Sequence, residues 1–193
     1  MIELAVANRK EQYLSEDLIV RYSAPTLAGI KTGSLFTLHT SSEDLRQDIS
    51  ALNKVMSKKG IRIIPLKVCD TYALIYIYRP EMLDRDLKDP KAEKILAGFG
   101  YPVNSPDRCV TDLARRLNSS PVFPHEIGLF LGYPPSDVDG FIRNPHEGFS
   151  AVGYWKVYSD VENALRLFRN YKRCTEEYGR LLRSGRTLEQ LVV

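Results

Sequence analysis

The chain has 193 residues, of which 44% are hydrophobic and 26% are charged, and its formal net charge is +3. These are ordinary globular values, which argue against a disordered or fibrous protein. The length allows one well-buried core, so we expect a single domain over residues 1–193. The small net charge permits a local basic face but does not by itself indicate a nucleic-acid partner.

No secretory or membrane segment is expected. Residues 1–19 carry charged side chains and lack the apolar stretch of a signal peptide. No apolar run approaches the roughly 20 residues that a bilayer-spanning helix needs. The three cysteines, Cys69, Cys109 and Cys174, are far apart, which argues against a disulfide framework and a paired-cysteine zinc site. We therefore expect a cytoplasmic protein with no membrane partner and no metal.

Hydrophobic periodicity and turn residues predict both helices and strands. In the first half we expect a helix over about 14–30 interrupted at Pro25, a turn at 31–34, a strand over 35–39, a helix that Ser41 or Ser42 caps and Gly60 ends, and strands over 61–68 and 72–79. In the second half we expect helices at about 81–86, 90–99, 107–117, 125–131 and 136–143, a strand at 153–158, and a long helix over 161–182 opened by a Ser159–Glu162 capping box.

The two central strands point to the fold class. Only residues 69–71 separate them, which forces an antiparallel hairpin. The strand over 72–79 is apolar on both faces, so we expect it in the middle of a sheet that is covered on each side. Because strands and helices do not alternate strictly, the order favours a mixed or antiparallel sheet of about four strands packed with helices, an α+β fold with a long C-terminal helix.

Residues 28–34 hold the glycines, the lysine and the hydroxyls of a phosphate loop, but in the wrong order. A Walker loop follows a strand and enters a helix, whereas this segment follows a helix and enters a strand. We interpret it as a helix C-cap and turn with Lys31 near the negative end of the helix. A turn with two glycines and two hydroxyls beside a lysine can also bind an anion, and this alternative stays open.

The segment 124–135 places a histidine, a glutamate and three prolines around a short apolar helix. His125 is a candidate acid–base group near neutral pH, or else it caps the helix. Neighbouring residues on a helix point in different directions, so His125 and Glu126 are not expected to act as a pair. Gly128 and Gly132 can permit the close approach of another backbone or a ligand. No second histidine stands at metal-binding helical spacing, so a zinc hydrolase is not expected.

The predicted C-terminal helix is rich in arginine along one stripe. The residues are Arg166, Arg169, Arg173, Arg180 and Arg183, with Lys172 beside them. Such a stripe can bind nucleic acid or an acidic protein. Glutamates within the helix dilute the charge and no aromatic recognition motif accompanies it, so we favour a solvated amphipathic helix.

Three stretches of the chain, residues 24–36, 125–134 and 153–158, resemble one bacterial family. They are similar to the domain-of-unknown-function family 3793, which is found mainly in anaerobic Firmicutes, and the similarity spans nearly the whole chain. The resemblance implies a bacterial cytosolic protein. It carries over no catalytic role, and the cofactor stays unknown.

We expect the segments 24–36, 79–80 and 124–135 to form one pocket for a small anionic or phosphorylated ligand or cofactor, because their polar residues lie at element ends. The expected ligand-binding residues are Thr26, Lys31, Thr32, Ser34, Arg79, Glu126, Tyr133 and Trp155. In an enzyme, His125 would be the acid–base group, and Lys31 and Arg79 would stabilise charge. The alternative is a non-catalytic protein that binds nucleic acid or an acidic protein through the arginine stripe.

Overall fold

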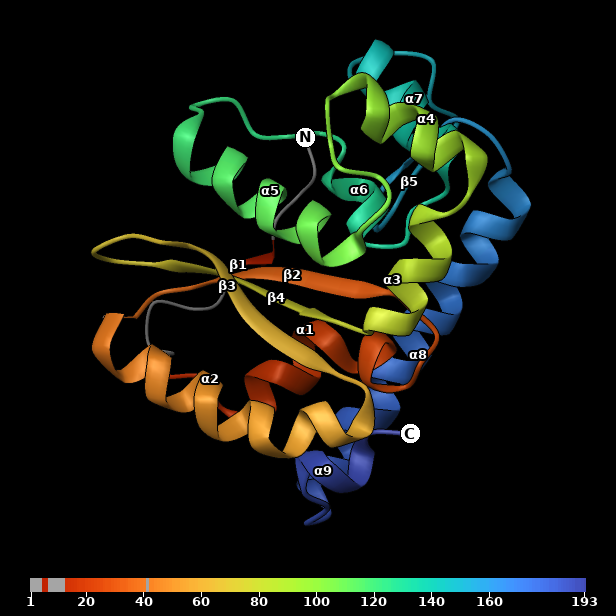
Figure 1. Ribbon diagram of the computed structural model, residues 1–193. Helices are drawn as coiled ribbons and strands as arrows, with labels where there is room; N and C mark the ends of the chain where they lie inside the picture. The colour runs from red at the N-terminus through yellow and green to blue at the C-terminus, as the bar shows by residue number, and fades with distance from the viewer. Residues whose placement is uncertain (1–4, 7–12, 41) are drawn as a thin grey trace. The chain divides into compact units, whose positions relative to one another are not determined.

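The computed structural model describes residues 5–6, 13–40 and 42–193 (Figure 1). The chain divides into two compact units. The sheet unit comprises the described part of Leu4–Pro80 together with Tyr171–Val193, and the helical unit comprises Glu81–Asn170. Two compact units can belong to one domain or to two, so the single domain expected from the sequence stays a prediction.

The sheet unit is built around a four-stranded mixed sheet with the strand order β1-β2-β4-β3. β1 pairs parallel with β2, whereas β2 and β3 both pair antiparallel with β4. Helices α1, α2 and α9 lie on the same side of this sheet (Figure 1). The elements are β1 (Ala5–Val6), α1 (Glu16–Leu27), β2 (Gly33–Leu38), α2 (Ser42–Met56), the 3-10 turn η1 (Ser57–Lys59), β3 (Arg62–Val68), β4 (Ala73–Tyr78) and α9 (Leu188–Leu191).

The β3–β4 hairpin and the central position of β4 confirm the sequence prediction. β4 is buried along its whole length and lies between β2 and β3. Its residues Ile75 and Ile77 belong to a core cluster that also contains Phe36 from β2, Leu18 from α1 and Leu45 from α2. Apolar aliphatic and aromatic side chains therefore fill the space between this face of the sheet and its helices.

Helix α1 runs through Pro25 to Leu27, so the predicted interruption is wrong. Pro25 lies in the last turn of α1. The backbone hydrogen bond that proline cannot donate is therefore missing only near the end of the helix. Ser15 caps the other end, because its side chain accepts a hydrogen bond from the backbone N–H of Leu18 at 3.2 Å. Gly29, with φ of 69°, turns the chain after the C-cap. This confirms the interpretation of the segment as a helix C-cap and turn.

The helical unit contains several short helices and one small hairpin. Helices α3, α4, α5 and α7 each have a proline as their first residue, the position where a missing N–H costs no helical hydrogen bond. The elements are α3 (Pro80–Leu87), α4 (Pro90–Gly98), α5 (Pro106–Ser119), α6 (Ile127–Phe130), α7 (Pro135–Arg143), β5 (Ala151–Val152) and β6 (Lys156–Val157).

The strand predicted over 153–158 is instead the turn and second strand of the β5–β6 hairpin. Gly153 lies in the turn, where its N–H bonds the carbonyl of Trp155 at 3.0 Å. A side chain at this glycine would also overlap the Phe168 ring, because a Cβ at this position would lie only 2.2 Å from it. The sheet unit takes its fourth strand from β1 instead, so the α+β class is confirmed although one of its strands was misassigned.

The long helix α8 (Val161–Arg183) confirms the predicted C-terminal helix and continues from the helical unit into the sheet unit. Its predicted capping box is wrong. Asp160 caps the helix by accepting the N–H of Asn163 at 3.0 Å, whereas Ser159 donates its hydroxyl to Asp137 at 2.7 Å. Across the described part of the chain, no helix has the length and apolarity that crossing a membrane requires.

Candidate functional site

The residues predicted to bind a ligand are divided between the two units. Five of them, Thr26, Lys31, Thr32, Ser34 and Arg79, belong to the sheet unit, and Glu126, Tyr133 and Trp155 belong to the helical unit with His125. The single pocket expected from all three segments stays a prediction.

Arg79 follows β4 and binds the C-terminal end of α1. Its guanidinium donates to the carbonyls of Thr26 at 2.7 Å and Leu27 at 2.6 Å, and to the carbonyl of Val193 at 2.5 Å. The last carbonyls of a helix have no partner within the helix, so a cation placed there supplies the missing donors. In this structure Arg79 therefore joins α1, β4 and the C-terminal segment of the sheet unit.

Lys31 is buried in the turn between α1 and β2, with 6% of its surface exposed. Its ammonium group donates to the carbonyl of Gly33, and beside it the hydroxyls of Thr26 and Ser34 lie 2.9 Å apart in a hydrogen bond. Burial lowers the pKa of Lys31 from 10.5 to about 7. A lysine with such a pKa is partly neutral at neutral pH, so it stabilises an anion less strongly than an exposed lysine does.

The helical unit contains a pocket that brings His125, Tyr133 and Trp155 together. Its cavity volume is about 60 Å³, and further space lies at its opening to solvent. Its residues come from the segment before α6, from α6 itself, from the α6–α7 connection, from α7 and from the β5–β6 hairpin. The lining residues are His125, Gly128, Tyr133, Asp137, Val138, Phe141, Val152, Gly153, Tyr154, Trp155 and Lys156.

Asp137 fixes the wall of this pocket, and the sequence analysis did not identify it. Its Oδ2 accepts the indole N–H of Trp155 at 2.7 Å. Its Oδ1 accepts the backbone N–H of Tyr158 at 2.9 Å, and both the N–H and the hydroxyl of Ser159 at 2.8 and 2.7 Å. Four donors on a carboxylate that is only 2% exposed satisfy its buried charge and hold the hairpin against α7.

His125 contributes an atom without a partner. Its Nδ1 is buried and has no hydrogen-bond partner among the described residues. Its ring meets the Phe141 ring edge to face, with the centroids 5.0 Å apart. Burial lowers the pKa of His125, so its neutral form is favoured. The predicted helix-capping role is wrong, because Glu126 is the N-cap residue of α6 and makes no side-chain capping bond.

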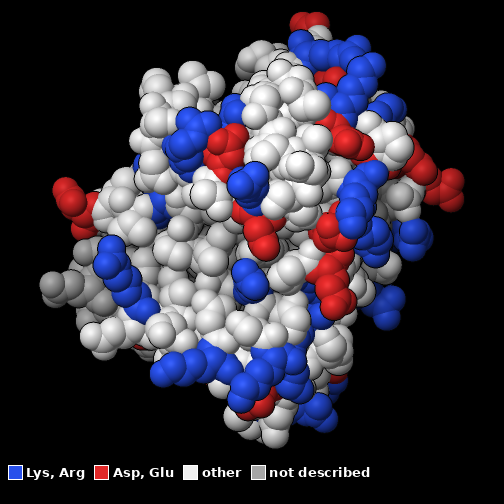
Figure 2. Space-filling model, in the orientation of Figure 1, with Lys and Arg blue, Asp and Glu red and all other residues white. Residues whose placement is uncertain are grey.

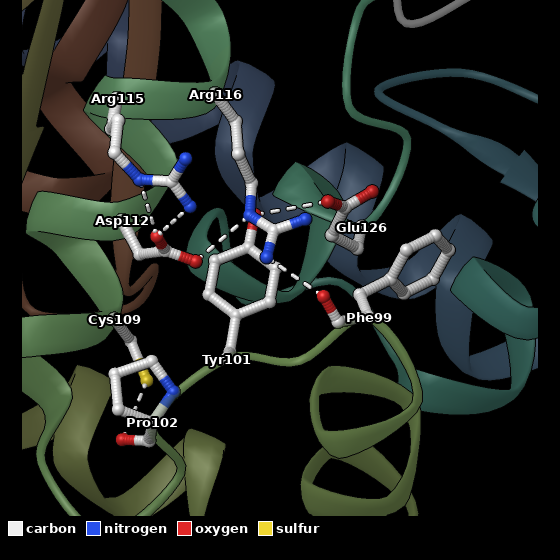
Figure 3. A network of polar contacts seen from close by, with 8 residues as sticks. All are labelled: Phe99, Tyr101, Pro102, Cys109, Asp112, Arg115, Arg116 and Glu126. Carbon is white, nitrogen blue, oxygen red and sulfur yellow. Dashed lines mark hydrogen bonds and ion pairs between the residues drawn. The ribbon is translucent and has the colours of Figure 1, made fainter.

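Glu126 belongs to a separate network of polar side chains (Figure 3). Its Oε1 accepts a hydrogen bond from the hydroxyl of Tyr101 at 2.9 Å, and only 3% of Glu126 is exposed. The guanidinium of Arg116 lies 4.2 Å from the centroid of the Tyr101 ring and donates to Asp112 at 2.8 Å. Burial and the Glu126 carboxylate raise the pKa of Tyr101, so its hydroxyl keeps its proton and its hydrogen bond.

The side chains of His125 and Glu126 therefore make contacts in different parts of the unit, as their adjacency in the sequence predicted. His125 lines the pocket, whereas Glu126 anchors the start of α6 to Tyr101, in the segment before α5. Gly128 allows this close packing, since a Cβ there would lie 2.9 Å from Val138 and 3.1 Å from Tyr133. The sequence led us to expect another backbone or a ligand close to this glycine, whereas the side chains of Val138 and Tyr133 make the close approach.

Lys156 is the cation of the pocket lining. Its ammonium donates to the carbonyl of Pro145 at 2.7 Å and lies 4.4 Å from the centroid of the Phe149 ring. An ammonium has three donors, so one bond to a carbonyl leaves capacity for a further acceptor. The described residues contain no cluster of metal-ligating side chains. Burial raises the pKa of the Cys109 and Cys174 thiols, which keeps both protonated at neutral pH.

The comparisons with known proteins give one result. The model of the family described as a protein of unknown function (DUF3793) matches residues 19–192, so the chain belongs to that family. No curated protein and no solved structure shows significant similarity to it. The family assignment agrees with the resemblance seen in the sequence.

Proposed function

We propose that this member of the DUF3793 family binds a small anionic or phosphorylated molecule in the pocket of the helical unit. The observation that carries the proposal is the buried Nδ1 of His125, which has no partner among the described residues. A buried polar atom without a hydrogen bond costs about 1–3 kcal/mol. A ligand atom that bonds Nδ1 would recover that free energy.

The hydrogen-bond donors of the pocket lining favour an anion. Asp137 already accepts four hydrogen bonds within the unit, so its acceptor capacity is used there and not on a ligand. Lys156 retains donor capacity, and a neutral imidazole protonated at Nδ1 is a donor as well. Two donors that lie beside an aromatic lining suit the carboxylate or phosphate group of a small molecule.

A wider form of the proposal adds the segments 24–36 and 79–80, with Lys31 and Arg79 as charge groups. The Arg79 donors bond main-chain carbonyls of the sheet unit, so the helical-unit pocket has the stronger support. Lys31→Met separates the two forms, because it weakens ligand binding only in the wider one. If the protein is an enzyme, the neutral imidazole of His125 is the group that accepts a proton from the substrate.

Thermal unfolding in the presence of phosphate esters tests the proposal. Ribose 5-phosphate, phenyl phosphate and inorganic phosphate are suitable probes, each added at increasing concentration. At 100 times its dissociation constant, a bound ester should raise Tm by roughly 5 °C or more. His125→Ala should abolish the shift, and His146→Ala, which changes an exposed histidine of the same unit, should retain it. A shift that survives His125→Ala would overturn the proposal, as would no shift with any of the esters.

A second candidate function is the binding of nucleic acid or an acidic protein by α8. Arg166, Arg169, Arg173 and Arg183 are exposed on this helix, and this exposure is the observation in its favour. Arg180 already forms a two-bond pair with Glu177. Figure 2 shows basic side chains intermingled with acidic ones on the face in view, not a continuous basic surface. We therefore rank this function second; a steep loss of binding with added salt would support it.

We also propose a bacterial cytosolic location. All three cysteines, Cys69, Cys109 and Cys174, are free thiols, as a reducing compartment favours. Cell fractionation of a bacterial source would place the protein with cytosolic markers if this is correct.

A further inference from the structure

We infer that the ligand of the helical-unit pocket carries a planar aromatic or heteroaromatic ring next to its anionic group. This inference rests on the proposed function and names the class of molecule that the same site takes. It follows from the kind of side chains that form the lining and from the way in which they are held.

Ring side chains dominate the pocket. Five of its eleven lining residues carry a ring, and the only aliphatic side chains are those of Val138 and Val152. The rings come from four separate segments that the fold brings together. They are His125, Tyr133, Phe141, Tyr154 and Trp155.

The rings are held in fixed orientations by contacts within the helical unit. Trp155 is bonded to Asp137 through its indole N–H, stacks on Tyr133 with the centroids 4.8 Å apart, and meets Phe168 edge to face at 4.6 Å. His125 and Phe141 form a second, perpendicular pair. A ligand entering this lining does not have to order it, which is the property of a preorganised site.

Planar rings gain more from such a lining than saturated rings of equal size. Aromatic pairs attract each other through their quadrupoles beyond the burial of area, which corresponds to about twofold to tenfold in affinity per favourable pair. The site offers several such partners. Tyr154 is 41% exposed and Val152 is 62% exposed, so both are accessible to an incoming ring.

The polar groups define where the anionic group of the ligand would lie. His125 and Lys156 both line the pocket, and Phe141 is near both of them: its ring centroid lies 5.0 Å from that of His125 and 5.9 Å from the ammonium of Lys156. An anionic substituent attached directly to a ring can therefore reach His125 or Lys156 while the ring contacts the aromatic lining.

Nuclear magnetic resonance of the indole N–H tests this inference. Trp155 is the only tryptophan of the chain, so a ¹⁵N-labelled sample gives a single indole signal that reports on the pocket. The probes are phenyl phosphate and cyclohexyl phosphate, which differ in planarity but carry the same anionic group, and inorganic phosphate. We expect phenyl phosphate to bind about tenfold more tightly than cyclohexyl phosphate, and inorganic phosphate to leave the signal in place.

Two variants and one control make the result specific. Tyr133→Leu and Tyr154→Leu should each reduce the preference for phenyl phosphate, to less than about threefold when one ring pair is lost. Tyr13→Leu changes a tyrosine of the sheet unit that is 66% exposed and should leave the preference unchanged. The backbone signals of each variant show whether it is folded, and Tyr154→Leu, at the more exposed position, is the variant expected to fold without difficulty.

The outcomes distinguish this inference from the proposed function. Equal binding of phenyl and cyclohexyl phosphate, with loss of both in His125→Ala, overturns the aromatic preference and supports the anion site. Binding of neither ester, or binding of both that persists in His125→Ala, overturns the proposed function and this inference with it. A phenyl preference that Tyr133→Leu and Tyr154→Leu both leave intact places the ring elsewhere and also overturns the inference.

Discussion

Polar side chains have opposite roles in the two units. In the sheet unit, Arg79 and Lys31 donate to main-chain carbonyls at the end of α1 and the start of β2. In the helical unit, Asp137 is equally saturated, but the Nδ1 of His125, which lines the same pocket, has no partner among the described residues. The first arrangement completes the backbone hydrogen bonding of the fold, whereas the second leaves a polar atom of the protein available to a ligand.

The comparison shows what a charged residue at an element end indicates. Helix ends and strand ends carry carbonyls and N–H groups that need partners, so a cation there is first a structural group. A binding role requires in addition a cavity and a polar atom that the protein leaves unsatisfied. Among the residues selected from the sequence, His125 meets both conditions.

Removing the saturated carboxylate should have the largest effect. Asp137→Ala deletes the acceptor of four hydrogen bonds, so we expect a loss of about 4 kcal/mol in the free energy of unfolding and release of Trp155 to solvent. Urea unfolding followed by Trp155 fluorescence measures both, the second as a red shift of the emission. Asp139→Ala, which breaks an exposed ion pair with Arg143 on the same helix, should cost less than about 1 kcal/mol. Equal losses in the two variants would show that Asp137 does not organise the pocket wall.

Arg79→Met should be the next most damaging substitution. It removes the charged hydrogen bonds to the carbonyls of Thr26, Leu27 and Val193, at a cost of about 3 kcal/mol. Arg46→Met, at an exposed position of α2 in the same unit, should change the free energy of unfolding by less than about 0.5 kcal/mol. If Arg79→Met instead leaves stability unchanged but removes ligand binding, Arg79 is a ligand group and the contrast between the units fails.

Lys31 should make stability depend on alkaline pH. Its pKa of about 7 in the folded protein lies below its ordinary value of 10.5, so the unfolded chain binds the extra proton between these limits. Stability therefore rises with pH in this window, by about 2 kcal/mol between pH 7.5 and 9 from this one group. Lys31→Met should remove that rise, which urea unfolding at the two pH values measures. An equal rise in wild-type protein and Lys31→Met would show that Lys31 is charged in the folded state.

His125 should have a smaller effect on stability than Lys31, and at acidic instead of alkaline pH. Because burial lowers its pKa, the unfolded chain binds a proton more readily as the pH falls through about 6.5, and the folded protein loses stability there. We expect His125→Gln to remove part of this loss between pH 7.5 and 5.5, measured by urea unfolding against His146→Gln. A steeper loss in His125→Gln than in wild type would mean that the folded protein favours the charged imidazole.

The sequence predicted the fold well where local patterns decide it. The short connection at residues 69–71 and the two apolar faces of β4 determine the hairpin and its central position. β1 escaped prediction because Ala5–Val6 is too short to show a period and depends on its pairing with β2. Helix α9 was missed although its signal is readable, since Thr187 and Gln190 form a complete capping box.

The site was predicted only in part, for a different reason. His125, Tyr133 and Trp155 could be selected because they stand among glycines and prolines or on an aromatic segment. Asp137 could not, because its four donors come from the hairpin and the residues after it, about 20 positions away. The guanidinium of Arg79 likewise donates to remote carbonyls, which no local pattern shows.

Native mass spectrometry of freshly purified protein tests the central claim most directly. The wild-type protein and His146→Ala should carry a small bound molecule that collisional activation releases, and its fragments should contain a carboxylate or phosphate group. His125→Ala, purified in the same way, should carry none. The same molecule retained on His125→Ala, or no bound molecule on any of the three proteins, would contradict the account.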